Sequence, residues 1–159
     1  MKVRVMLADD HVGFREALRM YLELAPDIEV VAEASDGRNV LQSVDQARPD
    51  VVCMDLNMPG LDGIDTTRQL LIIQPHAKVI GLSASVDLVR VAEMFNAGAL
   101  GYVLKGSAGE ELLAAIRSVS HNQRYLSPEL GLKDVAELAR YAMPAPTPLV
   151  PPAPIYPEG

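Results

Sequence analysis

Acidic residues and one lysine stand directly after apolar runs that are typical of β-strands. The run MKVRVMLA is followed by Asp9 and Asp10, DVVCM by Asp55, and GYVL by Lys105. In an open parallel α/β sheet, the carboxyl ends of the strands meet at one edge, so side chains far apart in sequence converge there. The sequence therefore predicts one site with three carboxylates and an ammonium group.

Such a site favours a divalent cation and phosphoryl chemistry. Two like charges about 4 Å apart cost on the order of 4 kcal/mol at an effective dielectric constant of 20, and a divalent cation attracts each carboxylate about twice as strongly. A few oxygen ligands suit Mg²⁺, which keeps several of its waters. A carboxylate beside Mg²⁺ and a lysine can attack phosphorus and become an acyl phosphate. Asp55 is the best candidate nucleophile, and Ser83 can offer its hydroxyl to a phosphoryl oxygen.

The elements that must position these residues alternate between strand-like and helix-like patterns. The expected strands are 2–8, 28–34, 50–54, 77–83 and 101–105. The expected helices are 11–24, 36–47, 62–75 and 86–98, and a fifth begins with a capping box at Ser107-Ala-Gly-Glu110. Short connections between alternating elements favour right-handed crossovers, so we expect a doubly wound α/β fold with a five-stranded parallel sheet.

The C-terminal part of the chain has a different composition. Ser127-Pro128 is typical of a helix start, and apolar residues follow at helical spacing: Val135, Leu138, Ala139 and Ala142. Residues 144–159 contain seven prolines, which favours an extended, polyproline-like tail. The expected division is a domain over 1–122, a linker with a sixth helix over 123–143, and a proline-rich tail over 144–159.

Composition narrows the class of protein. The net charge is −7, which argues against a broad surface that follows nucleic-acid phosphates. The chain has one cysteine, Cys53, so it forms no internal disulfide, and packing as a small hydrophobe is favoured over a redox or catalytic thiol. No stretch approaches the ~18 apolar residues of a membrane span, and acidic residues come too early for a signal peptide. We expect a cytoplasmic protein.

These motifs resemble the receiver domain of bacterial two-component response regulators over residues 2–122. The resemblance rests on ADD at 8–10, MDLNMPGLDG at 54–63, LSA at 82–84 and GYVLK at 101–105. Gaps of 45, 28 and 22 residues separate, in order, Asp10, Asp55, Ser83 and Lys105, and they fit the spacing of that family. The segment RYLSPEL at 124–130, with no proline after the lysine, is further similar to the LuxR-type (NarL/FixJ) subfamily.

The resemblance implies a fold, a modification and a set of roles. The sheet would be flavodoxin-like, in the order 2-1-3-4-5, and a sensor histidine kinase would phosphorylate Asp55. Mg²⁺ would be bound by Asp10, Asp55 and the backbone carbonyl of Asn57, with Asp9 acting through a water. Lys105 would hold a phosphoryl oxygen, and Ser83 and Tyr102 would be the switch residues. Such a protein catalyses only its own phosphorylation and dephosphorylation.

Two other functions stay open. LuxR-type regulators continue into a helix-turn-helix domain, so one alternative is the receiver fragment of a transcriptional regulator whose DNA-binding domain is absent from this chain. A Mg²⁺-dependent phosphohydrolase of the haloacid-dehalogenase type is disfavoured, because it needs a second aspartate where this chain has Asn57. Residues 130–159 carry little positive charge, so we expect no DNA binding by this chain. Its output would be phosphorylation-dependent contact with a second copy or an effector protein.

Single residues also have simpler interpretations. Asp10, taken alone, is better explained as a cap for the first helix, but a cap needs none of the other three residues, so their joint arrangement favours the site. The histidines His11, His76 and His121 lie in different connections or helix ends, and the sequence predicts no zinc site from them.

Overall fold

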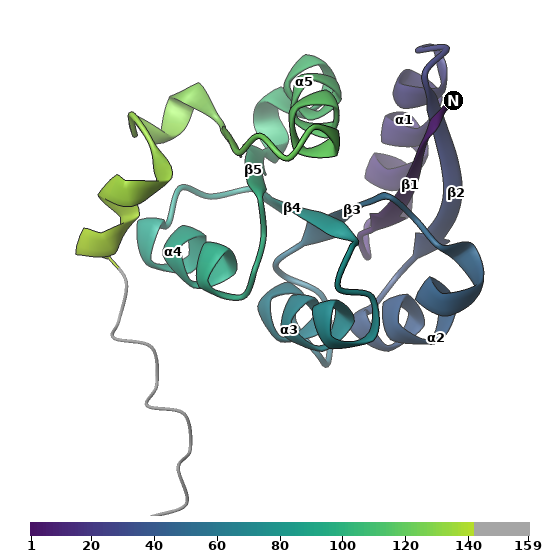
Figure 1. Cartoon of the computed structure of the whole chain (residues 1–159), viewed down its shortest axis with the longest axis horizontal. Helices are drawn as coiled ribbons and strands as arrows, with labels where there is room; N and C mark the ends of the chain where they lie inside the picture. Colours follow the sequence, from purple (N-terminus) through teal and green to yellow (C-terminus); the bar gives the residue numbers. More distant parts are fainter. Residues whose placement is uncertain (142–159) are drawn as a thin grey trace, which may run out of the picture.

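The computed structural model describes residues 1–141, and over them six parallel strands form one sheet in the order β2-β1-β3-β4-β5-β6 (Figure 1). The strands are β1 (Val3–Ala8), β2 (Ile28–Ala34), β3 (Val51–Asp55), β4 (Lys78–Ser83), β5 (Gly101–Leu104) and β6 (Tyr125–Leu126). The α-helices in the same part of the chain are α1 (Val12–Glu23), α2 (Gly37–Ala47), α3 (Gly63–Ile73), α4 (Leu88–Asn96) and α5 (Ala108–Ser120).

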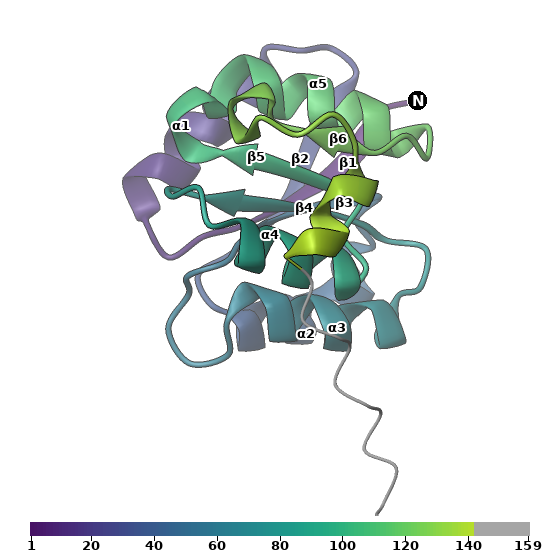
Figure 2. The same cartoon turned by 90° about the vertical axis from the view of Figure 1, so that its left-hand side faces the viewer.

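The helices cover both faces of the sheet, as predicted. Figures 1 and 2 show α1 and α5 on one face and α2, α3 and α4 on the other. The central strand β3 is buried along its whole length: Val51 and Cys53 pack toward α1 and α5, and Val52 and Met54 toward the opposite layer. A strand buried on both faces must be apolar throughout, which explains its sequence. Burial raises the pKa of the Cys53 thiol, in keeping with packing as a small hydrophobe.

The sheet has one strand more than the predicted five. Tyr125 and Leu126 form β6, which pairs in parallel with Gly101 and Tyr102 of β5. The N–H of Ser127 then donates to the carbonyl of Tyr102 at 2.9 Å. A two-residue strand is too short to show a periodic pattern, so the local sequence does not predict it. Its pairing follows from the position at which α5 returns the chain to the sheet.

The predicted sixth α-helix is replaced by two 3₁₀ segments, η2 (Pro128–Leu130) and η3 (Val135–Arg140). Gly131 ends the first with a left-handed φ of 71°, and the Asp134 side chain caps the second by accepting from the N–H of Glu137. Leu138 is buried where η3 packs on α4 (Figure 2), so the predicted apolar stripe is confirmed at this residue, whereas Ala139 is exposed. Ala142 and the predicted proline-rich tail lie outside the described residues.

Helix starts agree with the sequence at α3 and differ at α5. Asp62 caps α3 as predicted, its carboxylate accepting from the N–H of Asp65 at 2.9 Å. The capping box predicted at Ser107 is wrong, because Lys105–Ser107 first form a 3₁₀ turn (η1) and the serine side chain makes no cap. In residues 1–141, no helix has the length and apolar content needed to cross a membrane.

Candidate functional site

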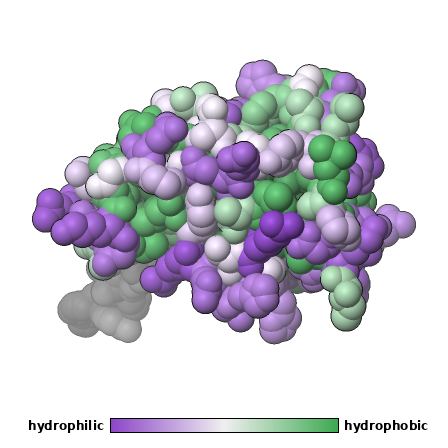
Figure 3. All heavy atoms as spheres, turned by 90° about the horizontal axis from the view of Figure 1, so that it is seen from above, coloured by the Kyte–Doolittle hydropathy of each residue, from purple (hydrophilic) through white to green (hydrophobic). Residues whose placement is uncertain are grey.

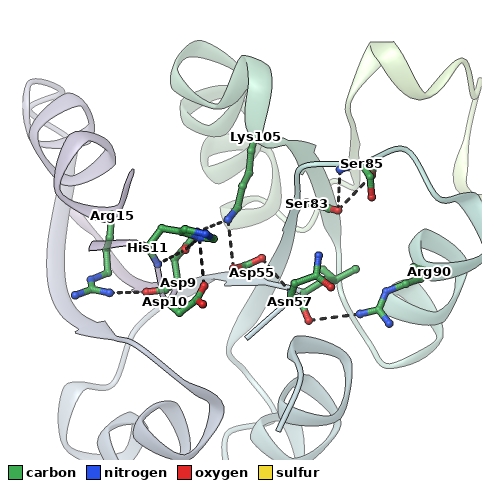
Figure 4. A network of polar contacts seen from close by, with 11 residues as sticks. Asp9, Asp10, His11, Arg15, Asp55, Asn57, Ser83, Ser85, Arg90 and Lys105 are labelled. Atoms are coloured by element: carbon green, nitrogen blue, oxygen red, sulfur yellow. Dashed lines mark hydrogen bonds and ion pairs between the residues drawn. The ribbon is translucent and has the colours of Figure 1, made fainter. Parts of the chain in front are cut away.

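The parallel strands bring the predicted residues to one edge of the sheet. Asp9 and Asp10 follow β1, Asp55 ends β3, and Lys105 follows β5, so all four leave the sheet at its carboxyl end. Ser83 ends the neighbouring strand β4, paired with the last residue of β5. Figure 4 shows the three aspartates and the lysine gathered around one point, with Ser83 to one side of them in contact with Ser85. The predicted convergence is confirmed.

The Lys105 ammonium group connects two of the carboxylates. Its Nζ lies 2.7 Å from Asp9 Oδ2 and 3.2 Å from Asp55 Oδ2. Both aspartates are 1% exposed, and the lysine side chain is 14% exposed. The same ammonium lies 4.8 Å from the centre of the Phe14 ring, a cation–π contact that further restricts it. The lysine therefore supplies a fixed positive charge inside the acidic cluster.

The loop after β3 fixes the other side of Asp55. Its Oδ1 accepts a hydrogen bond from the backbone N–H of Asn57 at 3.1 Å. At Gly63, a Cβ atom would lie 2.2 Å from the carbonyl oxygen of Asp55, so only glycine lets α3 begin this close to the strand end. Gly60, with a φ of 77°, turns the loop between them.

The donor set fits Mg²⁺. Asp9, Asp10 and Asp55 each offer a carboxylate oxygen, and these oxygens lie within 4.8 Å of one another. In residues 1–141, three buried oxygens have no partner apart from one basic side chain each: the Lys105 ammonium lies beside Asp9 Oδ2 and Asp55 Oδ2, and the His11 ring lies beside Asp10 Oδ1. Carboxylate oxygens held this close together are what a hard divalent cation prefers.

Burial raises the pKa of Asp55, and the nearby Asp9 carboxylate raises it further. The Asn57 N–H and Lys105 oppose this rise without cancelling it. The folded protein therefore disfavours the ionised form of Asp55 relative to the unfolded chain, where the pKa is near its ordinary value of 3.8.

We expect Asp55→Asn to stabilise the metal-free protein at pH 7 by about 1–2 kcal/mol. The contribution of Asp55 to stability is fully present below the ordinary pKa and is lost as the pH rises through the raised pKa of the folded state. The advantage of the variant should therefore grow above about pH 4 and disappear below it. Urea unfolding of both proteins across this range measures it. A variant less stable than wild type at pH 7 would show that the Lys105 attraction outweighs burial.

The two expected switch residues, Ser83 and Tyr102, lie beside this site and differ in their contacts. Ser83 Oγ donates to the carbonyl of Ser85 and accepts from its N–H, both at 3.2 Å. The Tyr102 ring is fully buried, close to Gly81 and Met94. Burial raises the pKa of the Tyr102 hydroxyl, which has no hydrogen-bond partner in residues 1–141. The serine is thus engaged with its own loop, while the tyrosine already points inward.

Sequence reasoning missed three residues that touch the site. His11 Nδ1 lies 3.0 Å from Asp9 Oδ1 and 3.2 Å from Asp10 Oδ1, although the sequence linked this histidine to no cluster. Arg15 donates from α1 to the Asp9 carbonyl, and Arg90 donates from α4 to a carbonyl of the loop after β3 at 3.4 Å. The only available signal was the position of His11 directly after the acidic pair. Asp10 is not a helix cap, since His11 occupies that position of α1.

Comparison with known proteins identifies the family. The sequence pattern of the response regulator receiver domain matches residues 5–117. The chain belongs to this family. The transcriptional regulatory protein DegU of Brevibacillus brevis is 35% identical over 139 residues, covering 87% of this chain and 59% of that protein. The transcriptional regulatory protein LiaR of Bacillus subtilis is 40% identical over 136 residues, covering 86% of this chain and 64% of that protein.

The fold of this receiver domain agrees with that of a solved relative. A two-component response regulator of the LuxR family from Aurantimonas sp. SI85-9A1 superposes with a TM-score of 0.81 at 34% identity, covering 88% of this chain and 99% of that one. The predicted similarity to LuxR-type receiver domains is confirmed. The receiver chain spans about 60% of the length of the two curated relatives, which are 59% and 64% covered.

Proposed function

We propose that this receiver domain is a signalling switch that accepts a phosphoryl group on Asp55 from a sensor histidine kinase. The observation that carries the proposal is the Lys105 ammonium, held between the buried carboxylates of Asp9 and Asp55 at the carboxyl edge of the sheet. An isolated structural ion pair needs one carboxylate. A single lysine among three closely spaced carboxylates suits a site that also receives a cation and a phosphoryl group.

The residues divide the chemistry between them. An Asp55 oxygen attacks phosphorus; the new P–O bond forms as the bond from phosphorus to the donor breaks, and its electron pair leaves with the donor. The Asn57 N–H orients the carboxylate through Oδ1, and Lys105 shifts its charge toward the incoming phosphoryl oxygens. Mg²⁺, when bound, neutralises negative charge on the phosphoryl oxygens and the carboxylates. Its proposed ligands are Asp10, Asp55 and the carbonyl of Asn57, with Asp9 acting through a water.

A groove beside the site suits the kinase. It has a volume of about 650 Å³ and lies between α1 and the start of α5, lined by Phe14 and Tyr21 among others and reaching Lys105. Figure 3 views this face, on which apolar side chains gather in patches among hydrophilic ones. A groove that reaches Lys105, the ion-pair partner of Asp55, would let a partner dock while presenting a phosphoryl donor.

The output is proposed to be protein contact through the face formed by α4, β5 and α5. Val86 and Val89, at the start of α4, are large apolar side chains left 55% and 41% exposed. The partner would be a second copy or an effector protein, with no DNA binding by residues 1–159 and no turnover of any other substrate.

We assign the receiver to residues 1–122, the linker to 123–143 and a tail to 144–159, in a cytoplasmic protein. Similarity to transcriptional regulatory proteins supports the alternative of a receiver that controls a DNA-binding domain.

Acetyl phosphate tests the proposal without a kinase. The wild-type protein should gain the mass of one phosphoryl group when Mg²⁺ is present, and none when a chelator removes the metal. Intact-mass spectrometry reads both outcomes. Equal uptake with and without Mg²⁺ would contradict the proposed site.

Ser83→Ala is expected to separate phosphorylation from the response to it. The hydroxyl lies 4% exposed next to the site and can leave Ser85 for a phosphoryl oxygen, so its loss should leave uptake intact and weaken the conformational change. Amide chemical shifts of α4 with and without beryllofluoride measure the change. The matched control is Ser85→Ala, which removes an exposed hydroxyl and keeps the backbone partner. A full response in Ser83→Ala would rule out this coupling.

A further inference from the structure

We propose that Arg15 is a positioning residue that holds Asp9 and Asp10, at the turn from β1 into α1, in their metal-binding geometry. It acts through the backbone of Asp9. The inference rests on the proposed function, because it concerns the same carboxylates. No feature of the sequence pointed to it, since Arg15 lies in a helix and its partners lie in two other parts of the fold, the turn after β1 and strand β2.

The contacts of Arg15 join three elements. Its Nη1 donates to the carbonyl oxygen of Asp9, at the turn from β1 into α1, as Figure 4 shows. Its Nε pairs with Glu33 Oε1 of β2 at 2.8 Å. The Arg15 side chain is 14% exposed and that of Glu33 21% exposed, so water competes weakly for both. The ion pair with Glu33 therefore already restricts the guanidinium, independently of its bond to Asp9.

The carbonyl that Arg15 holds sets the direction of two carboxylates. It belongs to the planar peptide that joins Asp9 to Asp10, so fixing its oxygen fixes the orientation of both residues. The N–H of Asp9 is held independently by the carbonyl of Ala34 at 3.0 Å. Asp9 is thus anchored on both sides of its Cα atom, with its own carboxylate left for Lys105 and the cation site.

The charge of Arg15 is largely compensated. Glu33 accepts from Arg15 with one oxygen and pairs with Arg19 through the other, while Glu23 also pairs with Arg19 at 3.5 Å, so two carboxylates face two guanidinium groups. The net charge near the acidic site therefore changes little because of Arg15. Its guanidinium acts by fixing the orientation of the Asp9 backbone. Arg19 provides the matched control, because it shares Glu33 and the same helix but has no contact with Asp9 among its hydrogen bonds and ion pairs in residues 1–141.

The experiment compares Arg15→Gln with Arg19→Gln in the full 159-residue chain. Isothermal titration gives the dissociation constant for Mg²⁺, and the carbonyl ¹³C shift of Asp9 reports the bond to the loop. We expect Arg15→Gln to weaken Mg²⁺ binding about 10-fold or more, as losses of groups that orient metal ligands do. Arg19→Gln should stay within about 2-fold and leave the Asp9 shift unchanged. Thermal unfolding confirms that both variants are folded at the titration temperature.

Three results would overturn the role of Arg15. The first is an unchanged Mg²⁺ affinity in Arg15→Gln, and the second is an equal loss in both variants, which would make the Glu33 cluster merely structural. The third is an Asp9 carbonyl shift that does not move in Arg15→Gln. Because these readouts need no phosphoryl group, they are distinct from failure of the proposed function, which would appear as no uptake in the wild type despite Mg²⁺ binding.

Discussion

Replacing Lys105 by Met is expected to lower the free energy of unfolding of the metal-free protein by up to about 3 kcal/mol. The substitution removes the positive charge that lies 2.7 Å from Asp9 and 3.2 Å from Asp55, and it leaves both carboxylates buried beside each other. Mg²⁺ restores a positive charge to the cluster, so it should stabilise the variant more than it stabilises wild type. Urea unfolding with Mg²⁺ or with a chelator measures both effects.

Lys78→Met is the matched control. Lys78 starts β4, whose carboxyl end lies at the site, and its ammonium donates to the carbonyl of Ser120 at 3.1 Å. Lys78→Met should lower the free energy of unfolding by less than Lys105→Met does, and this decrease should not depend on Mg²⁺. If Lys105→Met were as stable as wild type in the chelator, the lysine would not be balancing the carboxylates, and the electrostatic account of the site would be wrong.

Asp55→Asn should reduce phosphoryl uptake from acetyl phosphate on the order of 1,000-fold or more, as the loss of a nucleophile does in enzymes. An amide has no carboxylate oxygen with which to form an acyl phosphate, while its shape preserves the packing at the end of β3. The expected gain in stability of the same variant excludes unfolding as the cause. Intact-mass spectrometry over time compares the rates.

Asp65→Asn controls for the removal of one negative charge. Asp65 lies in α3, where it is paired with Arg68 on the surface, and it should take up the phosphoryl group at the wild-type rate. Uptake by Asp55→Asn at that same rate would mean that another group is the acceptor.

The convergence of the site was predictable because it follows from topology. Once strands and helices alternate in a parallel sheet, the carboxyl ends of the strands lie at one edge, and Asp9, Asp55 and Lys105 occupy three of those ends. Predicting that these side chains converge required knowledge of neither their rotamers nor their contacts. The sequence was therefore sufficient for the residues that strand ends position directly.

What the sequence missed depends on contacts between elements. Arg15 reaches a carbonyl six residues back and a carboxylate on another strand, and His11 joins the carboxylates through the turn geometry at the start of α1. Tyr102 is buried by its packing beside Gly81 and Met94, which a position on β5 does not reveal. These contacts depend on side-chain directions and on how the elements pack, and neither leaves a local pattern.

The C-terminal segment was misread for a different reason. The apolar spacing after Ser127 is helical, but Gly131 interrupts it with a left-handed backbone, and six residues are too few to favour an α-helix without further support. The stripe still packs on α4, through Leu138. Periodicity therefore identified Leu138 as buried and Val135 as half-buried, whereas Ala139 is exposed and the type of helix differs from the prediction.

The most direct test of the central claim is to locate the phosphoryl group by chemistry. Borohydride reduces an acyl phosphate to an alcohol, which converts the modified aspartate to homoserine at its position in the chain. After treatment with acetyl phosphate and Mg²⁺, peptide sequencing by mass spectrometry should find homoserine at position 55 and at no other aspartate. Homoserine at position 9 or 10, or its absence from a chain that carries the phosphoryl mass, would contradict Asp55 as the acceptor.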